Sequence, residues 1–217
     1  MISLVLALVG LLVGVIVEGI ATGRSLQSIR TNPGRTPVVA IATGLLFAVT
    51  PLAVDVDWVL PAYLWFVAVT VTLTLTDLDT KLIPNRILFP GTAVGFVLLM
   101  GGAIIEDGPI LRPLAGGAIY FVLLLVLALI ARGGFGFGDV KLAFLLGLFT
   151  AYQSWETLIV AIFAAFLLGG LVSAILVVFR IRSRKDSIPF GPYLVGGAYL
   201  AIVWAGTLAS WYLDAAA

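Results

Sequence analysis

Runs of about 20 apolar residues, separated by short polar connections, recur along the whole chain. A helix of that length crosses the hydrocarbon core of a bilayer with every backbone hydrogen bond made inside the segment. Only 11% of the 217 residues are charged, whereas an ordinary soluble domain has about 25%. The chain is therefore predicted to be an all-α, polytopic membrane helix bundle.

About eight transmembrane helices are expected. They are placed at residues 2–20, 37–54, 58–76, 87–105, 113–131, 142–154, 157–179 and 190–213. The sixth is the shortest of them. The connections are too short to hold a further domain, so residues 1–217 are expected to form a single integral-membrane domain.

The basic residues predict the orientation of these helices. Residues 21–36, 77–86, 132–141 and 180–189 hold eleven of the 12 Lys and Arg residues, and only Arg112 lies elsewhere. Lys and Arg accumulate in cytoplasmic loops, so these four connections are predicted to be cytoplasmic and the N-terminus to lie outside. No basic residue precedes the first apolar run, which is therefore expected to be a retained span rather than a cleaved signal peptide.

The chain contains no cysteine and no histidine. Disulfides, thiolate metal sites and histidine-based proton transfer or metal ligation are therefore excluded. Any acid–base catalysis is expected to depend on carboxylates.

Three acids lie at the predicted cytoplasmic face. Asp77 and Asp79 belong to "TDLDTKLIPNRILFP", and Asp139 belongs to "GGFGFGDVK". Ionisable residues at the bilayer boundary are costly and usually mark a function. Two neighbouring carboxylates share a proton, so one can activate water while the other protonates a carbonyl group.

Spacing alone does not choose between Asp77 and Asp79. On a helix, residues two apart point about 200° away from each other, so both cannot face one partner. Gly136 and Gly138 lack a Cβ atom, so the backbone beside Asp139 can approach another segment closely.

Each of these motifs also has a structural interpretation. Asp77 and Asp79 could be solvated residues at a helix end, with Lys81 and Arg86 as partners. Asp139 could serve helix capping. Pro84 could end a helical turn and Asn85 could cap the next span. Pro189 and Pro192 could be turn residues where the last span begins.

"DLDTKLIPN" followed by "GFGD" resembles the type IV prepilin peptidase family, membrane aspartyl proteases with a G-x-G-D motif. The family pattern is an Asp, six residues and then Pro-Asn, which corresponds to Asp77 with Pro84 and Asn85. The second catalytic Asp of the family closes G-x-G-D, which corresponds to Asp139. "IPFGPYLVGGAY" is similar to a Pro-Phe-Gly-Pro segment near the end of bacterial members.

The resemblance implies an aspartic endopeptidase with Asp77 and Asp139 as its catalytic dyad. Its partners would be type IV prepilins or pseudopilins, whose basic leader is cleaved at the cytoplasmic face of the cell membrane, and the lipid bilayer, with no nucleic acid. No cofactor and no metal are expected. The residues expected to bind substrate or support the site are Asp79, Lys81, Pro84, Asn85, Gly136, Gly138, Lys141, Pro189, Gly191 and Pro192.

The chain also departs from the family pattern. Many bacterial members carry a longer insert with paired cysteines after the first span, whereas the connection Ala21 to Pro37 is short and has none. Those longer members also N-methylate the product, an activity that is not expected here. "GVIVEG", Gly14 to Gly19, matches the first span of longer members poorly, and Glu18 is expected to snorkel toward the cytoplasmic boundary.

Two other classes of function remain for a membrane protein of this kind. A proton- or ion-coupled transporter would place acids near the middle of spans and show an inverted repeat, and the sequence shows neither. A non-catalytic scaffold of the same fold would be favoured by the loss of Asp77 or Asp139, and both are present.

Overall fold

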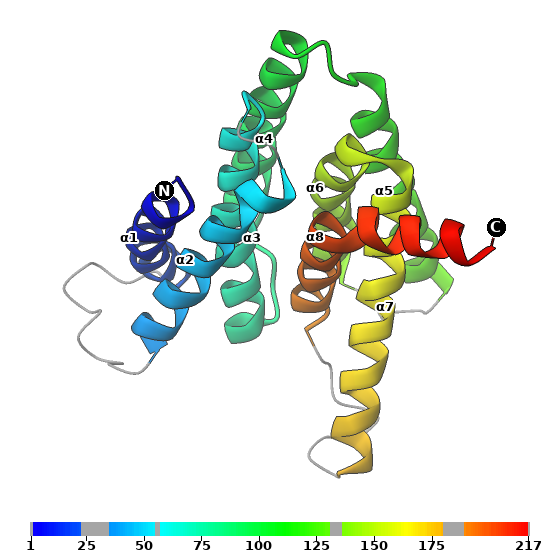
Figure 1. Ribbon diagram of the computed structural model, residues 1–217. Helices are drawn as coiled ribbons and strands as arrows, with labels where there is room; N and C mark the ends of the chain where they lie inside the picture. Colours follow the sequence, from blue (N-terminus) through cyan, green and yellow to red (C-terminus); the bar gives the residue numbers. More distant parts are fainter. Residues whose placement is uncertain (1, 23–34, 55–56, 131–135, 180–188, 217) are drawn as a thin grey trace. The chain divides into compact units, whose positions relative to one another are not determined.

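The structure is a computed structural model that describes residues 2–22, 35–54, 57–130, 136–179 and 189–216. Within these ranges the chain forms helices and no strand, so the predicted all-α class is confirmed. The helices are α1 (Ile2–Thr22), α2 (Arg35–Ala53), α3 (Leu60–Thr80), α4 (Asn85–Ile105), α5 (Leu111–Ile130), α6 (Phe137–Gln153), α7 (Trp155–Val178) and α8 (Gly191–Ala216) (Figure 1).

Six of the described helices, α1 to α5 and α7, are long and apolar enough to cross a membrane. The chain is therefore a multi-pass membrane protein. Helix α6 has 17 residues, which gives a length of about 25 Å, less than the thickness of a typical hydrocarbon core. This agrees with the prediction that the sixth helix is the shortest.

Two helix boundaries differ from the predicted ones in a way that concerns the acids. Helix α3 continues to Thr80 rather than ending at residue 76, and α6 begins at Phe137 rather than at residue 142. A hydropathy pattern ends a span at the first charged residue, whereas a helix continues until its backbone is capped. As a result Asp77, Asp79 and Asp139 all lie inside helices.

The helices pack into two compact units. Unit 1 comprises Met1–Thr80 and Pro84–Gly108 and contains α1 to α4, whereas unit 2 comprises Lys81–Ile83 and Pro109–Ala217 and contains α5 to α8. The three-residue segment between α3 and α4 thus belongs to unit 2, although both helices that flank it belong to unit 1. The expectation of a single domain stays a prediction.

In unit 1, small residues let helices α1 and α2 approach each other closely. A Cβ atom placed on Gly10 would lie 2.7 Å from the Cβ atom of Phe47, and one placed on Gly14 would lie 2.6 Å from the Cα atom of Ala40. Such distances are too short for any side chain, so the contact depends on this G-x-x-x-G pair. Helices α3 and α4 are joined by a hydrogen bond of 2.9 Å from the Trp65 indole N–H to the Gly91 carbonyl.

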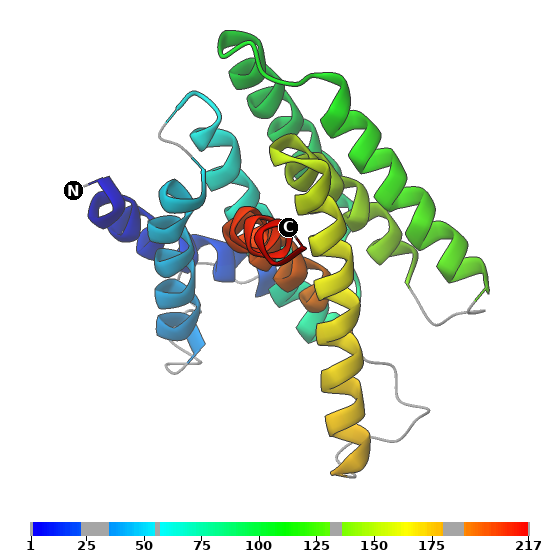
Figure 2. The ribbon, with the colours of Figure 1, turned by 45° about the vertical axis from the view of Figure 1, so that its right-hand side comes forward.

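In unit 2, glycines have the same role in two helix pairs. Helices α5 and α6 lie side by side (Figure 1, Figure 2), and a Cβ atom on Gly147 would lie 2.8 Å from the Cα atom of Gly117. Helices α7 and α8 meet at Gly197, where a Cβ atom would lie 2.7 Å from the Ala161 carbonyl oxygen. Close backbone contact is the usual mode of helix association where lipid offers no hydrophobic driving force.

Arg112, the basic residue that departs from the charge pattern, has a structural role in unit 2. Its Nε–H donates to the Ala151 carbonyl at 2.8 Å, and its Nη2 donates to the carbonyls of Tyr152 and, at 2.9 Å, Gln153. These carbonyls end α6, where no further turn of helix can supply donors. Arg112 therefore caps the C-terminus of α6 from the start of α5.

Candidate active site

Asp77 lies in the last turn of α3 and is only 4% exposed. The preceding residue, Thr76, is also buried, and its hydroxyl group donates to the Thr72 carbonyl at 2.8 Å. The interpretation of Asp77 as a solvated residue at a helix end is therefore wrong. Keeping a carboxyl group away from water is costly, and a buried acid near the end of a membrane helix is a candidate for function.

Asp79 lies on a different face of the same helix and is exposed. Its Oδ1 atom accepts a hydrogen bond of 2.8 Å from Arg35 Nη1 of α2, so its ion-pair partner is neither Lys81 nor Arg86. The predicted separation of the two acids on the helix is confirmed, because one is buried and the other is not. Asp77, rather than Asp79, has the surroundings expected of a catalytic carboxylate.

Asp139 is the third residue of α6 and is 7% exposed. Gly136 is the N-cap residue, and its backbone N–H donates to Asp139 Oδ2 at 3.1 Å. In the reverse direction, the Asp139 backbone N–H donates to the Gly136 carbonyl at 3.0 Å. The capping role of Asp139 is confirmed, and a carboxylate in the first turn of a helix also interacts favourably with the helix dipole.

The two glycines before Asp139, Gly136 and Gly138, have different neighbours. A Cβ atom on Gly138 would lie 2.9 Å from the Cβ atom of Ile83, so the first turn of α6 rests directly on the segment Lys81–Ile83 of its own unit. A Cβ atom on Gly136 would lie 3.3 Å from Asp139 Oδ2 and would crowd the capping carboxylate. The predicted close approach therefore occurs, and at Gly138 the neighbour is this chain itself.

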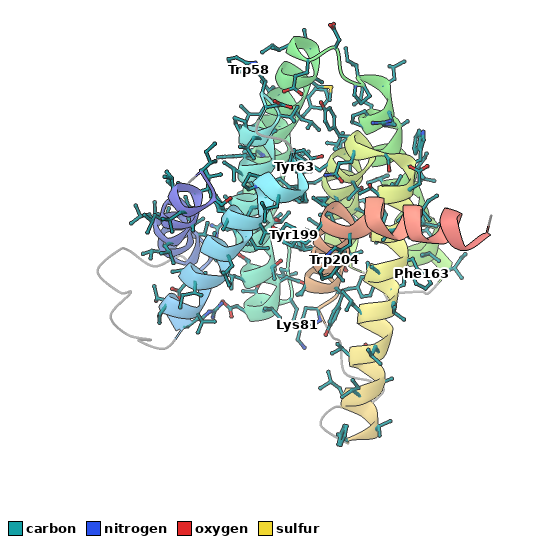
Figure 3. The ribbon with its side chains drawn as sticks, viewed as in Figure 1. Trp58, Tyr63, Lys81, Phe163, Tyr199 and Trp204 are labelled. Atoms are coloured by element: carbon teal, nitrogen blue, oxygen red, sulfur yellow. The ribbon has the colours of Figure 1, made fainter. Side chains whose placement is uncertain are left out.

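The segment after α3 is shaped by two backbone features. Lys81 has a φ of 55°, a left-handed conformation that ends a helix. It directly follows α3, at the opposite end of that helix from Trp58, which precedes its first residue, Leu60 (Figure 3). Pro84 is the N-cap of α4, and its carbonyl accepts from the backbone N–H groups of Ile87 and Leu88, both at 3.0 Å. Asn85 is the first residue of α4, so the prediction that it caps this helix is wrong.

The Pro-Phe-Gly-Pro segment forms the start of α8. The Phe190 carbonyl accepts from the backbone N–H groups of Tyr193 and Leu194, at 3.0 and 3.2 Å. The Phe190 ring lies 5.6 Å from the ring of Phe166 in α7, centroid to centroid.

Pro189 precedes this turn, Gly191 opens the helix and Pro192 lies in its first turn, where a missing N–H has little cost. The interpretation of these residues as the start of a helix is confirmed. A role in contacting substrate stays a prediction for all three. The same holds for Lys141, whose Nζ atom lies 4.8 Å from the centroid of the Phe137 ring one turn before it.

The contact between Arg35 and Glu18 is not predicted by any sequence pattern. Glu18 is 4% exposed, and its Oε1 atom lies 3.9 Å from Arg35 Nε. The prediction that Glu18 snorkels toward the boundary is therefore wrong. In the sequence, Arg35 is one of the basic residues from which the orientation of the helices in the membrane is predicted. No local pattern indicates its partners, because they lie on two other helices.

Among the described residues, no group of three or more acids is arranged to hold a metal ion. The expectation that the site needs neither a metal ion nor a cofactor rests on the residue types and stays a prediction. Three carboxyl groups are buried in the described ranges, Glu18 and Asp77 in unit 1 and Asp139 in unit 2. Of these, Glu18 lies beside Arg35, whereas Asp77 and Asp139 belong to the two motifs described above.

Comparisons with known proteins match the region that contains both carboxylates. The profile of the type IV leader peptidase family matches residues 64–174. A prepilin leader peptidase/N-methyltransferase of Aeromonas salmonicida is 30% identical over 182 residues, which are 83% of this chain and 62% of that protein. Proteins of the same name from Pseudomonas aeruginosa and Bacillus subtilis are 28% and 29% identical, over 92% and 83% of this chain and 69% and 70% of their own lengths.

The chain thus spans about three fifths of the Aeromonas relative that it matches. No solved structure matches it significantly.

Proposed function

Because the chain belongs to the type IV leader peptidase family, we propose that it is a membrane aspartic endopeptidase that removes the leader peptide from prepilins or pseudopilins. The observation that carries the proposal is that Asp77 and Asp139 are buried, at 4% and 7% exposure, whereas the third buried carboxyl group of the described residues, Glu18, lies outside the region that the family profile matches. Asp77 and Asp139 both lie in that region. The names of the relatives, prepilin leader peptidases, supply the substrate class.

The proposed mechanism uses one carboxylate and one carboxylic acid, without assigning the shared proton to either residue. The ionised group takes a proton from a water molecule while the water oxygen attacks the scissile carbonyl carbon. The protonated group gives its proton to the carbonyl oxygen. When the tetrahedral intermediate collapses, the C–N bond breaks, and the leaving amine takes the proton that the first carboxylate received. One hydroxyl group of the intermediate returns its proton to the second carboxylate as the carbonyl group forms again, so the pair ends with one proton, as it began.

The remaining site residues are proposed to support this pair. Gly136 would hold Asp139 through the backbone hydrogen bond to its carboxylate. Lys81, Pro84 and Asn85 would set the path of the chain after Asp77. We also propose that six further residues support the site or contact substrate: Asp79, Gly138, Lys141, Pro189, Gly191 and Pro192. We also propose that the site faces the cytoplasm from the cell membrane, in keeping with the distribution of Lys and Arg.

A cleavage assay tests the proposed function. The wild type, Asp77→Asn and Asp139→Asn are co-expressed with a prepilin from the same genome, and loss of the leader is followed by mass spectrometry. Each substitution preserves side-chain shape and removes the titratable group, so we expect cleavage to fall by about 10²- to 10⁴-fold. The same spectra report whether the new N-terminus gains a methyl group.

Asp79→Asn is a comparison variant rather than an inert control, because Asp79 lies two residues from Asp77 but is exposed. We expect it to weaken cleavage less than either dyad substitution. Wild-type cleavage by Asp77→Asn or Asp139→Asn would refute the dyad. Absence of cleavage by the wild type, with folded protein in the membrane and a panel of prepilins, would support a non-catalytic relative of the same fold.

A further inference from the structure

Arg35 connects three helices of unit 1 through one guanidinium group. It is the first residue of α2, and its Nη1 atom lies 2.8 Å from Asp79 Oδ1 of α3. Its Nε atom lies 3.9 Å from Glu18 Oε1 of α1. The contact with Asp79 is a hydrogen-bonded ion pair, whereas the contact with Glu18 is at the limit of an ion pair.

The charges that meet here are unfavourably placed in their own helices. Arg35 begins α2, where the helix dipole disfavours a positive charge, and Asp79 lies next to the last residue of α3, where the dipole disfavours a negative charge. Helix α3 has no basic residue in its last turn that could offset Asp79. The stability of the separate helices therefore does not explain why Arg35 and Asp79 occupy these positions. Their ion pair with each other does.

The contact fixes the part of α3 that carries Asp77. Asp79 and Asp77 lie in the same helical turn, so an anchor on one restrains the backbone of the other. The side chains of Arg35 and Asp79 are 30% and 33% exposed. An ion pair this exposed contributes little to the stability of a fold, so its main effect is expected on the geometry of the turn.

We propose that Arg35 is a positioning residue for leader cleavage, which holds the last turn of α3, and with it Asp77, in the geometry that the reaction requires. This inference rests on the proposed function. Arg35 acts through Asp79 rather than on the reacting atoms. A shift of about 1 Å in a catalytic group can slow a reaction about 100-fold without loss of the fold.

The first test compares Arg35→Met with Arg86→Met in the cleavage assay. Arg86 is a matched control, because it is an exposed arginine of the same unit at the start of α4. We expect kcat to fall about 10- to 100-fold in Arg35→Met with KM nearly unchanged, and to stay within about twofold in Arg86→Met. Thermal unfolding of the two variants should give similar midpoints.

The second test replaces the ion pair with a covalent link. The chain has no cysteine, so Arg35→Cys combined with Asp79→Cys creates the only two thiols. We expect a short bifunctional methanethiosulfonate reagent to restore kcat, and reduction to abolish the gain. Either single-cysteine variant treated in the same way should gain nothing. Because the link carries no charge, restoration would separate positioning from any electrostatic role of Asp79 toward substrate.

A third readout does not depend on cleavage. Hydrogen–deuterium exchange of the peptide that covers the last turn of α3 should be faster in Arg35→Met than in the wild type or Arg86→Met. Unchanged exchange would overturn the inference even if the wild type cleaved no prepilin. A wild type that cleaves together with an Arg35→Met variant of equal kcat, or one altered only in KM, would also overturn it and leave the proposed function standing.

Discussion

At the scale of single residues, Arg112 supplies hydrogen bonds that the end of α6 would otherwise lack. Removing it leaves three partly buried carbonyl groups at the end of α6 without that donor. We expect Arg112→Met to lower the free energy of unfolding by about 1–3 kcal/mol, measured by thermal or denaturant unfolding in detergent.

Two further variants define this effect. Arg112→Lys should recover only part of the loss, because an ammonium group lacks the planar fork of donors. Arg86→Met again serves as the control, since Arg86 is exposed. Equal stability of Arg112→Met and Arg86→Met would show that the cap contributes nothing.

The threonines of α3 allow a second residue-scale prediction. The hydroxyl groups of Thr72 and Thr76 donate to the carbonyl four residues earlier, at 2.7 and 2.8 Å. The hydroxyl oxygen of Thr74 is buried and has no hydrogen-bond partner among the described residues. Because a buried unpaired hydroxyl is unfavourable, we expect Thr74→Val to raise the free energy of unfolding by about 1 kcal/mol relative to Thr72→Val. The opposite order would show that the Thr74 hydroxyl has a partner in the working protein.

The difference between Asp77 and Asp79 could be predicted from the sequence, because helix periodicity alone puts them on different faces. The identity of the Asp79 partner could not. Arg35 and Asp79 are 44 positions apart, and their contact depends on how three helices pack. Nothing in the local sequence of Glu18 indicates that this acid lies buried beside Arg35.

At the scale of secondary structure, the sequence predicts the number and order of the helices, because each has its own apolar segment. It does not predict the ends that matter for the site. Helix α3 ends where Lys81 adopts a left-handed backbone, and α6 begins where Gly136 caps it. These ends are set by backbone hydrogen bonds and dihedral angles, which hydropathy does not represent.

Helix packing leads to a prediction with a matched pair of glycines. A Cβ atom on Gly147 would lie 2.5 Å from the Gly116 carbonyl oxygen, whereas one on Gly170 would have no neighbour within 4 Å. We expect Gly147→Ala to destabilise the protein by about 1–3 kcal/mol through the forced separation of α5 and α6. Gly170→Ala should instead stabilise it by up to about 1 kcal/mol, because alanine favours a helix more than glycine does.

Unfolding of both variants in the same detergent measures this difference. A destabilising Gly170→Ala, or a neutral Gly147→Ala, would contradict the packing described for these helices.

At the scale of the whole molecule, the composition and the apolar segments predict the fold class. The assignment of Lys81–Ile83 to unit 2, between two helices of unit 1, could not be predicted. Hydropathy treats this segment only as a connection. The close approach of Ile83 to Gly138 shows why it groups with α6.

The predicted orientation can be tested because the chain has no cysteine. Leu82 and Glu156 are both exposed, and the distribution of basic residues puts Leu82 on the cytoplasmic side and Glu156 outside. In intact cells we expect a membrane-impermeant maleimide to label Glu156→Cys and to label Leu82→Cys only after the cells are opened. The reverse pattern would invert the topology and place Asp77 on the outer side.

The cap that Arg112 provides has a consequence for how the chain is made. Helix α5 leaves the ribosome before α6, so the donor for the last carbonyls of α6 is already present when α6 is synthesised. A helix of 17 residues with a carboxylate in its first turn is a poor candidate to enter a bilayer alone. We therefore expect the translocon to release α5 and α6 into the lipid together, as a hairpin closed by this arginine.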